Sequence, residues 1–168
     1  VRNARLGEVY DDLGYYRRAA DHLTGTIASL QGDLERERFD MAGLPSVYAR
    51  AWLAWCLAEV GEFAEGIAQG EEGVAIAEAA DHDYSRVLAA WGLGTLHLVR
   101  GDPERAIPVL ERALVLIRMA DALVMFPFVA TPLGAAYALA GRLGDAVPLL
   151  EDGLRQAGTL NLQAHHPL

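Results

Sequence analysis

Four glycines recur along this chain at nearly regular intervals, and they constrain its fold more than any other feature. Gly61, Gly101 and Gly141 are 40 residues apart, and Gly14 lies 47 residues before Gly61. A leucine lies eight residues before each glycine, a small residue follows that leucine, and another small residue lies five residues after the glycine. These positions are Leu6, Leu53, Leu93 and Leu133, then Gly7, Ala54, Gly94 and Gly134, then Ala19, Gly66, Ala106 and Ala146. Four segments of the chain thus share the same three kinds of residue at the same distances from their glycine, which predicts an internal repeat.

Residues 89–114 indicate what one repeat folds into. Apolar residues follow helical spacing on both sides of Gly101, and Gly94 is a small residue on the apolar side that lets a neighbouring helix approach. Gly101 ends the first helix, because glycine adopts the left-handed backbone conformation without a steric penalty. Asp102 is placed to cap the second helix, and Pro103 fits its first position, where no amide hydrogen is needed. The segment therefore predicts two antiparallel helices joined by a tight turn.

Two of the repeats carry the residues of a known repeat family. The pattern is leucine and glycine, tyrosine three residues later, the turn glycine, and alanine in the second helix. The matching residues are Leu6, Gly7, Tyr10, Gly14, Tyr16 and Ala19 in the first repeat, and Leu133, Gly134, Tyr137, Gly141 and Ala146 in the last. The chain therefore resembles the tetratricopeptide repeats, although its period of 40 to 47 residues exceeds their usual length of about 34. The resemblance implies an all-α fold, an α-solenoid of about four antiparallel helix hairpins wound into a right-handed superhelix.

The repeats set the expected domain organisation. We expect a single domain over residues 1–168, with repeats at 1–31, 45–80, 83–120 and 123–158. The charged residues 31–43 are predicted to connect the first two hairpins, with Phe39 and Met41 holding this connection in place. Because the chain begins with valine and ends in a polar segment, we interpret it as a fragment of a larger protein.

A narrower resemblance concerns residues 43–82 and 100–114. These segments are similar to the long repeat tail of bacterial signalling regulators that also carry an adenylate or guanylate cyclase domain and an ATPase module. The resemblance implies a regulatory or sensor region of such a protein. No cyclase or ATPase motif occurs in this sequence, so such activity would belong to another part of the protein. One cysteine, Cys56, fits a reducing cytoplasm.

Composition argues against several classes of function. The net charge of −9 is unfavourable for binding nucleic acid, whose phosphates need a basic face. All 14 basic residues are arginine, which excludes mechanisms that need a P-loop, Schiff-base or kinase lysine. No nucleophile, base and oxyanion site come together in the sequence. We therefore predict a non-catalytic chain without a cofactor or metal.

Two motifs resemble chemical sites but have simpler interpretations. Asp81, His82 and Asp83 place two carboxylates beside an imidazole, yet no further ligand lies at metal spacing. We interpret this cluster as a turn at a helix start, where aspartate is a favoured cap. His97 occupies the slot of Tyr137 and is predicted to be a core residue.

Residues 122–141 carry no charge and are as long as a membrane span. This segment contains Pro127 and Pro132, and its second half keeps the repeat register. An inner helix of a solenoid is covered by neighbours on both sides and is therefore apolar nearly all round. We predict a buried helix and no contact with a membrane.

The resemblance also implies a concave surface that is lined by the first helix of each hairpin. Its slots are Glu8, Asp11, Tyr48, Trp55, Trp91, Thr95, Phe128 and Thr131, and Glu59 adds to the acidic end. Aromatic residues in a groove are typical anchors for a bound peptide, and acidic residues favour a basic partner segment. The alternative is that Trp55, Trp91 and Phe128 pack within the stack, because a small rotation of a helix decides which face is exposed.

Two further hypotheses concern other partners. Near the C-terminus, Gly153, Leu154, Leu160 and Leu162 would either pair with a second copy and form a homodimer or cover the last hairpin of their own chain. A small-molecule sensor would instead use a pocket between the aromatic residues of the second to fourth hairpins.

Overall fold

The computed structural model describes residues 14–159, and within that range every regular element is a helix. Seven α-helices and two short 3-10 helices follow one another between residues 14 and 159. They are α2 (Tyr16–Ser29), η1 (Gly32–Arg36), α3 (Pro45–Glu59), α4 (Phe63–Ala79), α5 (Asp83–Val99), α6 (Pro103–Met119), η2 (Leu123–Met125), α7 (Phe126–Leu139) and α8 (Leu143–Thr159). The helix expected at residues 1–13, with Glu8 and Asp11, lies outside the described residues, as do Leu160 and Leu162.

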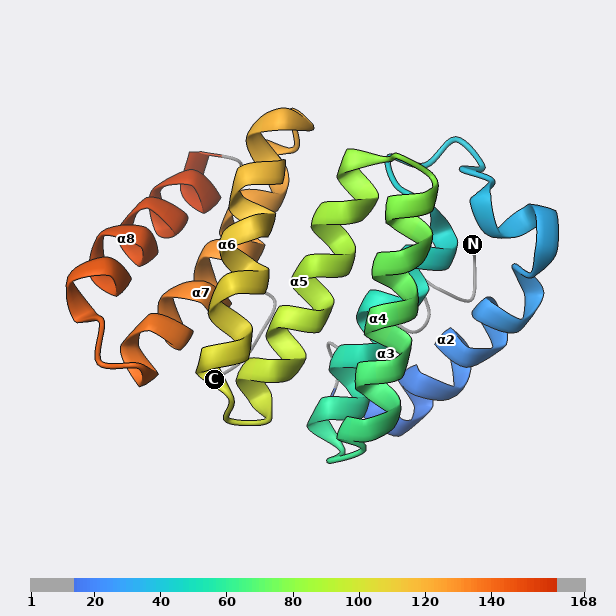
Figure 1. Cartoon of the computed structure of the whole chain (residues 1–168), viewed down its shortest axis with the longest axis horizontal. Helices are drawn as coiled ribbons and strands as arrows, with labels where there is room; N and C mark the ends of the chain where they lie inside the picture. The colour runs from blue at the N-terminus through green and yellow to red at the C-terminus, as the bar shows by residue number, and fades with distance from the viewer. Residues whose placement is uncertain (1–13, 160–168) are drawn as a thin grey trace.

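Three helix hairpins, α3/α4, α5/α6 and α7/α8, stack along the long axis of the molecule, with α2 packed against α3 at one end (Figure 1). Helix α5 contacts both helices of the preceding hairpin, and α7 contacts α6 and α5. Each first helix therefore lies between neighbours, which explains why α3 and α5 are buried nearly all round. This arrangement confirms the prediction of an all-α solenoid of antiparallel hairpins.

The turn glycines have the backbone conformation that the sequence predicts. Gly61, Gly101 and Gly141 have φ angles of 82°, 81° and 75°, in the left-handed region that glycine adopts most easily. The turns between hairpins use aspartate instead, since Asp81 and Asp121 have φ angles of 50° and 49°. These aspartates are also 40 residues apart, so they mark a second register of the repeat that the sequence interpretation missed.

Small residues let the two helices of a hairpin approach closely. A Cβ atom added to Gly94 would lie 2.5 Å from Cγ of Leu110, and one added to Gly134 would lie 2.5 Å from Cγ of Leu150. Asp102 caps α6 as predicted, because its side chain accepts a hydrogen bond from the backbone N–H of Arg105 at 3.3 Å. The predicted role of the small residue at Gly94 is confirmed.

The connection between α2 and α3 is held by polar contacts. The hydroxyl of Ser46 donates to the carbonyl oxygen of Glu35, and the buried Arg50 guanidinium lies 3.3 Å from Oε1 of Glu35 and 3.0 Å from Oε1 of Glu72. Phe39 is 46% exposed, so the expectation that it anchors this connection is wrong. Arg50, by contrast, is buried and reaches two carboxylates at once.

The uncharged residues 122–141 form a short 3-10 helix followed by α7, whose inner face is buried. Among residues 14–159, no helix is both long and apolar enough to cross a lipid bilayer.

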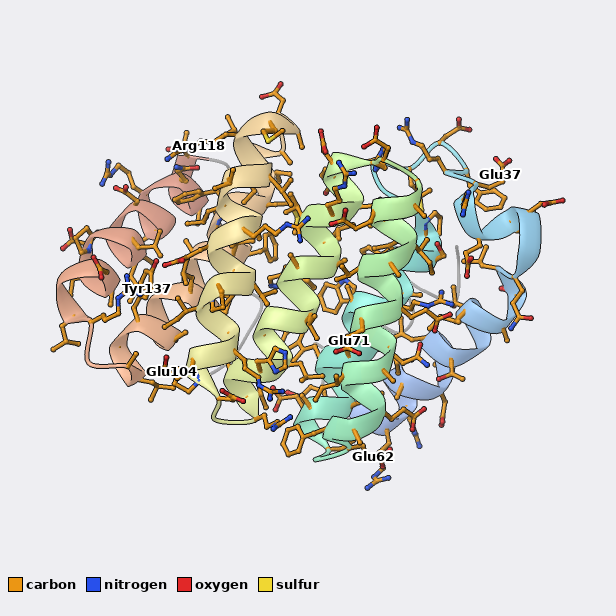
Figure 2. The ribbon with its side chains drawn as sticks, viewed as in Figure 1. Glu37, Glu62, Glu71, Glu104, Arg118 and Tyr137 are labelled. Atoms are coloured by element: carbon orange, nitrogen blue, oxygen red, sulfur yellow. The ribbon has the colours of Figure 1, made fainter. Side chains whose placement is uncertain are left out.

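Repeat-equivalent positions on α5 and α7 hold the buried His97 and Tyr137. Figure 2 labels Tyr137 on α7. The hydroxyl of Tyr137 donates to Oε1 of Glu111 at 2.7 Å, and burial together with this bond raises the pKa of Tyr137 to about 12. Burial also lowers the pKa of His97, an effect that the nearby Asp102 and Glu71 only partly oppose. The prediction that His97 is a core residue is confirmed.

We predict that Gly94→Ala destabilises the fold although alanine favours a helix. The new methyl group would overlap the fully buried Leu110, and such overpacking typically costs about 1–3 kcal/mol. Thermal unfolding followed by circular dichroism would measure the loss. The matched control is Gly25→Ala in α2, where a Cβ meets nothing within 4 Å and the substitution should stabilise by about 0.5–1 kcal/mol. Equal effects at both positions would contradict the packing argument.

We predict that His97→Tyr weakens the dependence of stability on pH. Below about pH 6.5 the unfolded chain protonates His97, whereas the folded chain, in which its pKa is lowered, resists protonation. The free energy of unfolding is therefore fully retained above that pH and falls as the pH decreases. Chemical denaturation at several pH values should give a shallower decline for the variant, whose tyrosine has Glu71 available as Tyr137 has Glu111.

In His97→Tyr the free energy of unfolding should still fall somewhat as the pH decreases, because His82 remains. The pKa of His82 is also lowered, chiefly by its partial burial. The same slope in the wild type and in His97→Tyr would contradict the prediction.

Candidate functional site

Five aromatic side chains form one continuous contact across the first helices of the three hairpins, and we call them the aromatic row. Trp52 lies 5.9 Å from Tyr48, 5.4 Å from Trp55 and 5.2 Å from Trp91, measured between ring centroids. Trp91 lies 5.7 Å from Trp55 and 6.5 Å from Phe128 in edge-on geometry. Tilted and edge-on contacts at these distances are favourable arrangements for aromatic pairs. The aromatic row therefore links α3, α5 and α7.

The aromatic row has a buried base and an exposed edge. Trp52 and Trp91 are buried, at 8% and 5% exposure, whereas Tyr48 and Trp55 are half-buried and Phe128 is 42% exposed. Of the predicted groove residues, Tyr48, Trp55 and Phe128 thus have surface that a partner molecule can reach.

Two predicted groove residues have a different place. Trp91 lies beneath the surface of the aromatic row, and Thr95 is buried at 8% exposure. Both belong to α5, the middle helix of the three, which neighbours cover on both sides. The prediction that Trp91 and Thr95 line the groove directly is therefore wrong, because both side chains lie below its surface.

Polar groups border the exposed edge. The indole N–H of Trp55 donates to Oε1 of Glu59 at 2.9 Å, one helical turn further along α3. Glu59 is exposed, so its carboxylate both orients the indole ring and remains accessible. Thr131 is also exposed, and its hydroxyl donates to the carbonyl oxygen of Pro127.

Sequence reasoning missed Trp52, which contacts three of the other four aromatic side chains. The groove slots of the family selected Tyr48 and Trp55 on α3 and passed over the residue between them. The spacing provides the missing signal, because Trp52 lies four residues after Tyr48 and three before Trp55, which places all three on one helix face.

The cluster Asp81, His82 and Asp83 is a helix-start turn. Nδ1 of His82 accepts a hydrogen bond from the backbone N–H of Ser85, so the histidine caps α5 in place of the expected aspartate. The two aspartates bind the guanidinium of Arg86 at 2.7 and 2.8 Å. No group of three potential metal ligands comes together in the part of the chain that the structure describes.

A cavity of about 220 Å³ is lined by side chains of α4, α5 and α6. Most of its lining is aliphatic, and Glu78 of α4 pairs with Arg112 of α6 and Arg86 of α5 beside it. The residues that line this cavity are Val74, Glu78, Arg86, Ala90, Leu93, Val109, Arg112 and Leu116. The small-molecule pocket was expected between the aromatic residues of the hairpins, and none of these side chains is aromatic.

Three segments of the chain match the family described as tetratricopeptide repeat, at residues 47–69, 87–112 and 127–152. Each matched segment runs from the first helix of one hairpin into its second helix. No curated protein matches the chain.

The matches agree with the hairpins, with the turn glycines and with the small residues at the helix contacts. Proteins of this fold typically present an extended surface for binding other proteins and are typically non-catalytic. The chain therefore contains tetratricopeptide repeats, which generally mediate protein–protein interaction.

Proposed function

We propose that this chain binds a segment of a partner protein along the aromatic row. The observation that carries the proposal is the edge formed by Tyr48, Trp55 and Phe128, which is partly exposed although it rests on the buried Trp52 and Trp91. Large aromatic surfaces of this kind are frequent energetic centres of protein interfaces. Because two of the five rings are buried, the exposed rings lose little conformational freedom on binding.

The partner segment that fits this surface combines apolar or aromatic side chains with arginine or lysine. The apolar side chains would contact Trp55 and Phe128, and a cation would pair with the exposed Glu59. The net charge of −9 favours the approach of a basic segment.

The setting that we propose is a regulatory or sensor region of a bacterial signalling protein in the cytoplasm. This part of the proposal rests on the resemblance of residues 43–82 and 100–114 to the repeat tails of cyclase-linked regulators. The gene that encodes this sequence provides the test. A cyclase or ATPase domain in the same reading frame would support the setting, and an unrelated neighbouring domain would contradict it.

We predict that Trp55→Ala and Phe128→Ala each weaken peptide binding at least tenfold, which corresponds to about 1.4 kcal/mol. The ligand is a peptide selected from a displayed random library against the wild-type chain, and fluorescence anisotropy gives its Kd. Glu59→Gln should weaken a basic peptide less, and its effect should shrink at high salt.

The matched control is Phe39→Ala, an aromatic residue that is 46% exposed in the connection before α3 and outside the aromatic row. Circular dichroism would establish that all variants are folded. A library that yields no binder, or Kd values for Trp55→Ala and Phe128→Ala equal to that of Phe39→Ala, would overturn the proposal.

A further inference from the structure

The cavity of about 220 Å³ lies where the second helices of two hairpins pack on one first helix. Helices α4 and α6 both pack against α5, which runs between them (Figure 1). Ala90 and Leu93 of α5 line the cavity together with Val74 of α4 and Val109 of α6. The aromatic row crosses the first helices α3, α5 and α7 instead, so the cavity is a separate site from the one proposed for a partner protein.

In the preceding repeat, a buried charged side chain occupies the equivalent position. Ala90 is the repeat equivalent of Arg50, which is 4% exposed, and Arg112 is the equivalent of Glu72. The Arg50 guanidinium lies 3.0 Å from Oε1 of Glu72, so an aliphatic stem with a charged end extends from α3 to α4. At Ala90 the side chain is a single methyl group, and the cavity lies beside it and Arg112.

We propose that the cavity binds a small aliphatic carboxylate, such as hexanoate. Its hydrocarbon chain takes the place that the stem of Arg50 has in the preceding repeat, and its carboxylate pairs with Arg112. The sign of the charge follows from the repeat, because an arginine stands where the preceding repeat has a glutamate. An anion is therefore complementary to Arg112, as the cation of Arg50 is complementary to Glu72.

The other charged groups around the cavity leave Arg112 available for such a ligand. Nη2 of Arg112 pairs with Glu78, and a guanidinium has five N–H donors, so donors remain for a second carboxylate. Arg112 is 60% exposed, which lets the charged end of the ligand stay in contact with water and lowers its desolvation cost. Arg86 binds Asp81 and Asp83 at 2.7 and 2.8 Å and also lies 4.0 Å from Glu78.

The volume of the cavity sets the length of the hydrocarbon chain. A cavity of about 150 Å³ holds benzene, so one of about 220 Å³ accommodates about nine non-hydrogen atoms, which is close to the size of hexanoate. Each CH₂ group that enters an apolar site improves affinity about fourfold. The Kd should therefore fall from butyrate to octanoate and change little for longer chains, whose additional carbon atoms stay in water. The net charge of −9 opposes the approach of any anion, so we expect a Kd in the millimolar range.

Methyl-resolved NMR of the whole chain, with hexanoate as the probe, tests the proposal. Titration to roughly tens of millimolar should saturably shift the methyl signals of the lining residues Val74, Ala90, Leu93, Val109 and Leu116. Ala90→Leu should abolish this response, because the larger side chain fills the cavity. Hexanamide, which has the same shape without the charge, should bind about threefold more weakly or worse.

The partner of the carboxylate is tested at Arg112, whose exposure lets the fold tolerate a substitution. Arg112→Gln should weaken the binding of hexanoate about threefold or more and leave that of hexanamide unchanged. The matched control is Arg105→Gln, which lies on the same helix, is 65% exposed and removes a pair with Asp102 outside the cavity. Circular dichroism would establish that all variants are folded.

A wild type whose cavity methyl signals do not shift saturably would overturn the proposal, as would an undiminished response in folded Ala90→Leu. Equal Kd values for hexanoate and hexanamide, or equal losses in Arg112→Gln and Arg105→Gln, would contradict the pairing of a carboxylate with Arg112. Peptide binding at the aromatic row should be the same in Ala90→Leu and in the wild type, so the cavity and the proposed function fail independently.

Discussion

The fold depends on the close approach of the two helices in each hairpin, and glycine makes that approach possible. At Gly94 and Gly134 the neighbouring leucine occupies the space where a Cβ atom would be. The same hairpins need a sharp reversal of the chain, which Gly101 and Gly141 provide through their positive φ angles. One kind of residue therefore fixes both the distance and the direction of the paired helices, and the stacking of hairpins follows from these two constraints.

The sequence predicted the fold well because its constraints are local. A turn glycine, a helix cap and a small residue at a helix contact each act within one hairpin, and their recurrence every 40 residues made them visible. The exposure of side chains was less predictable. Trp91 and Thr95 became buried because covering by neighbouring helices depends on the rotation of α5, which the spacing alone leaves undetermined. Trp52 was missed for another reason: the groove slots of the family pass over it, although its spacing from Tyr48 and Trp55 places it on their helix face.

The first connection illustrates how a longer repeat is accommodated. The spacing between Gly14 and Gly61 exceeds the other spacings by seven residues, and the additional chain lies in the segment that contains η1. The buried Arg50 stabilises this segment through Glu35 and also binds Glu72 of α4. At the equivalent positions of the next two repeats the residues are Ala90 and Ala130. The arginine is therefore specific to the place where an irregular segment, and not a full helix, covers the stack.

The surroundings of the aromatic row determine how its exposed edge can bind a partner. In the aromatic row, two buried tryptophans support the exposed rings from below and connect three helices. Such a surface is rigid before a partner arrives, and rigidity lowers the entropic cost of binding.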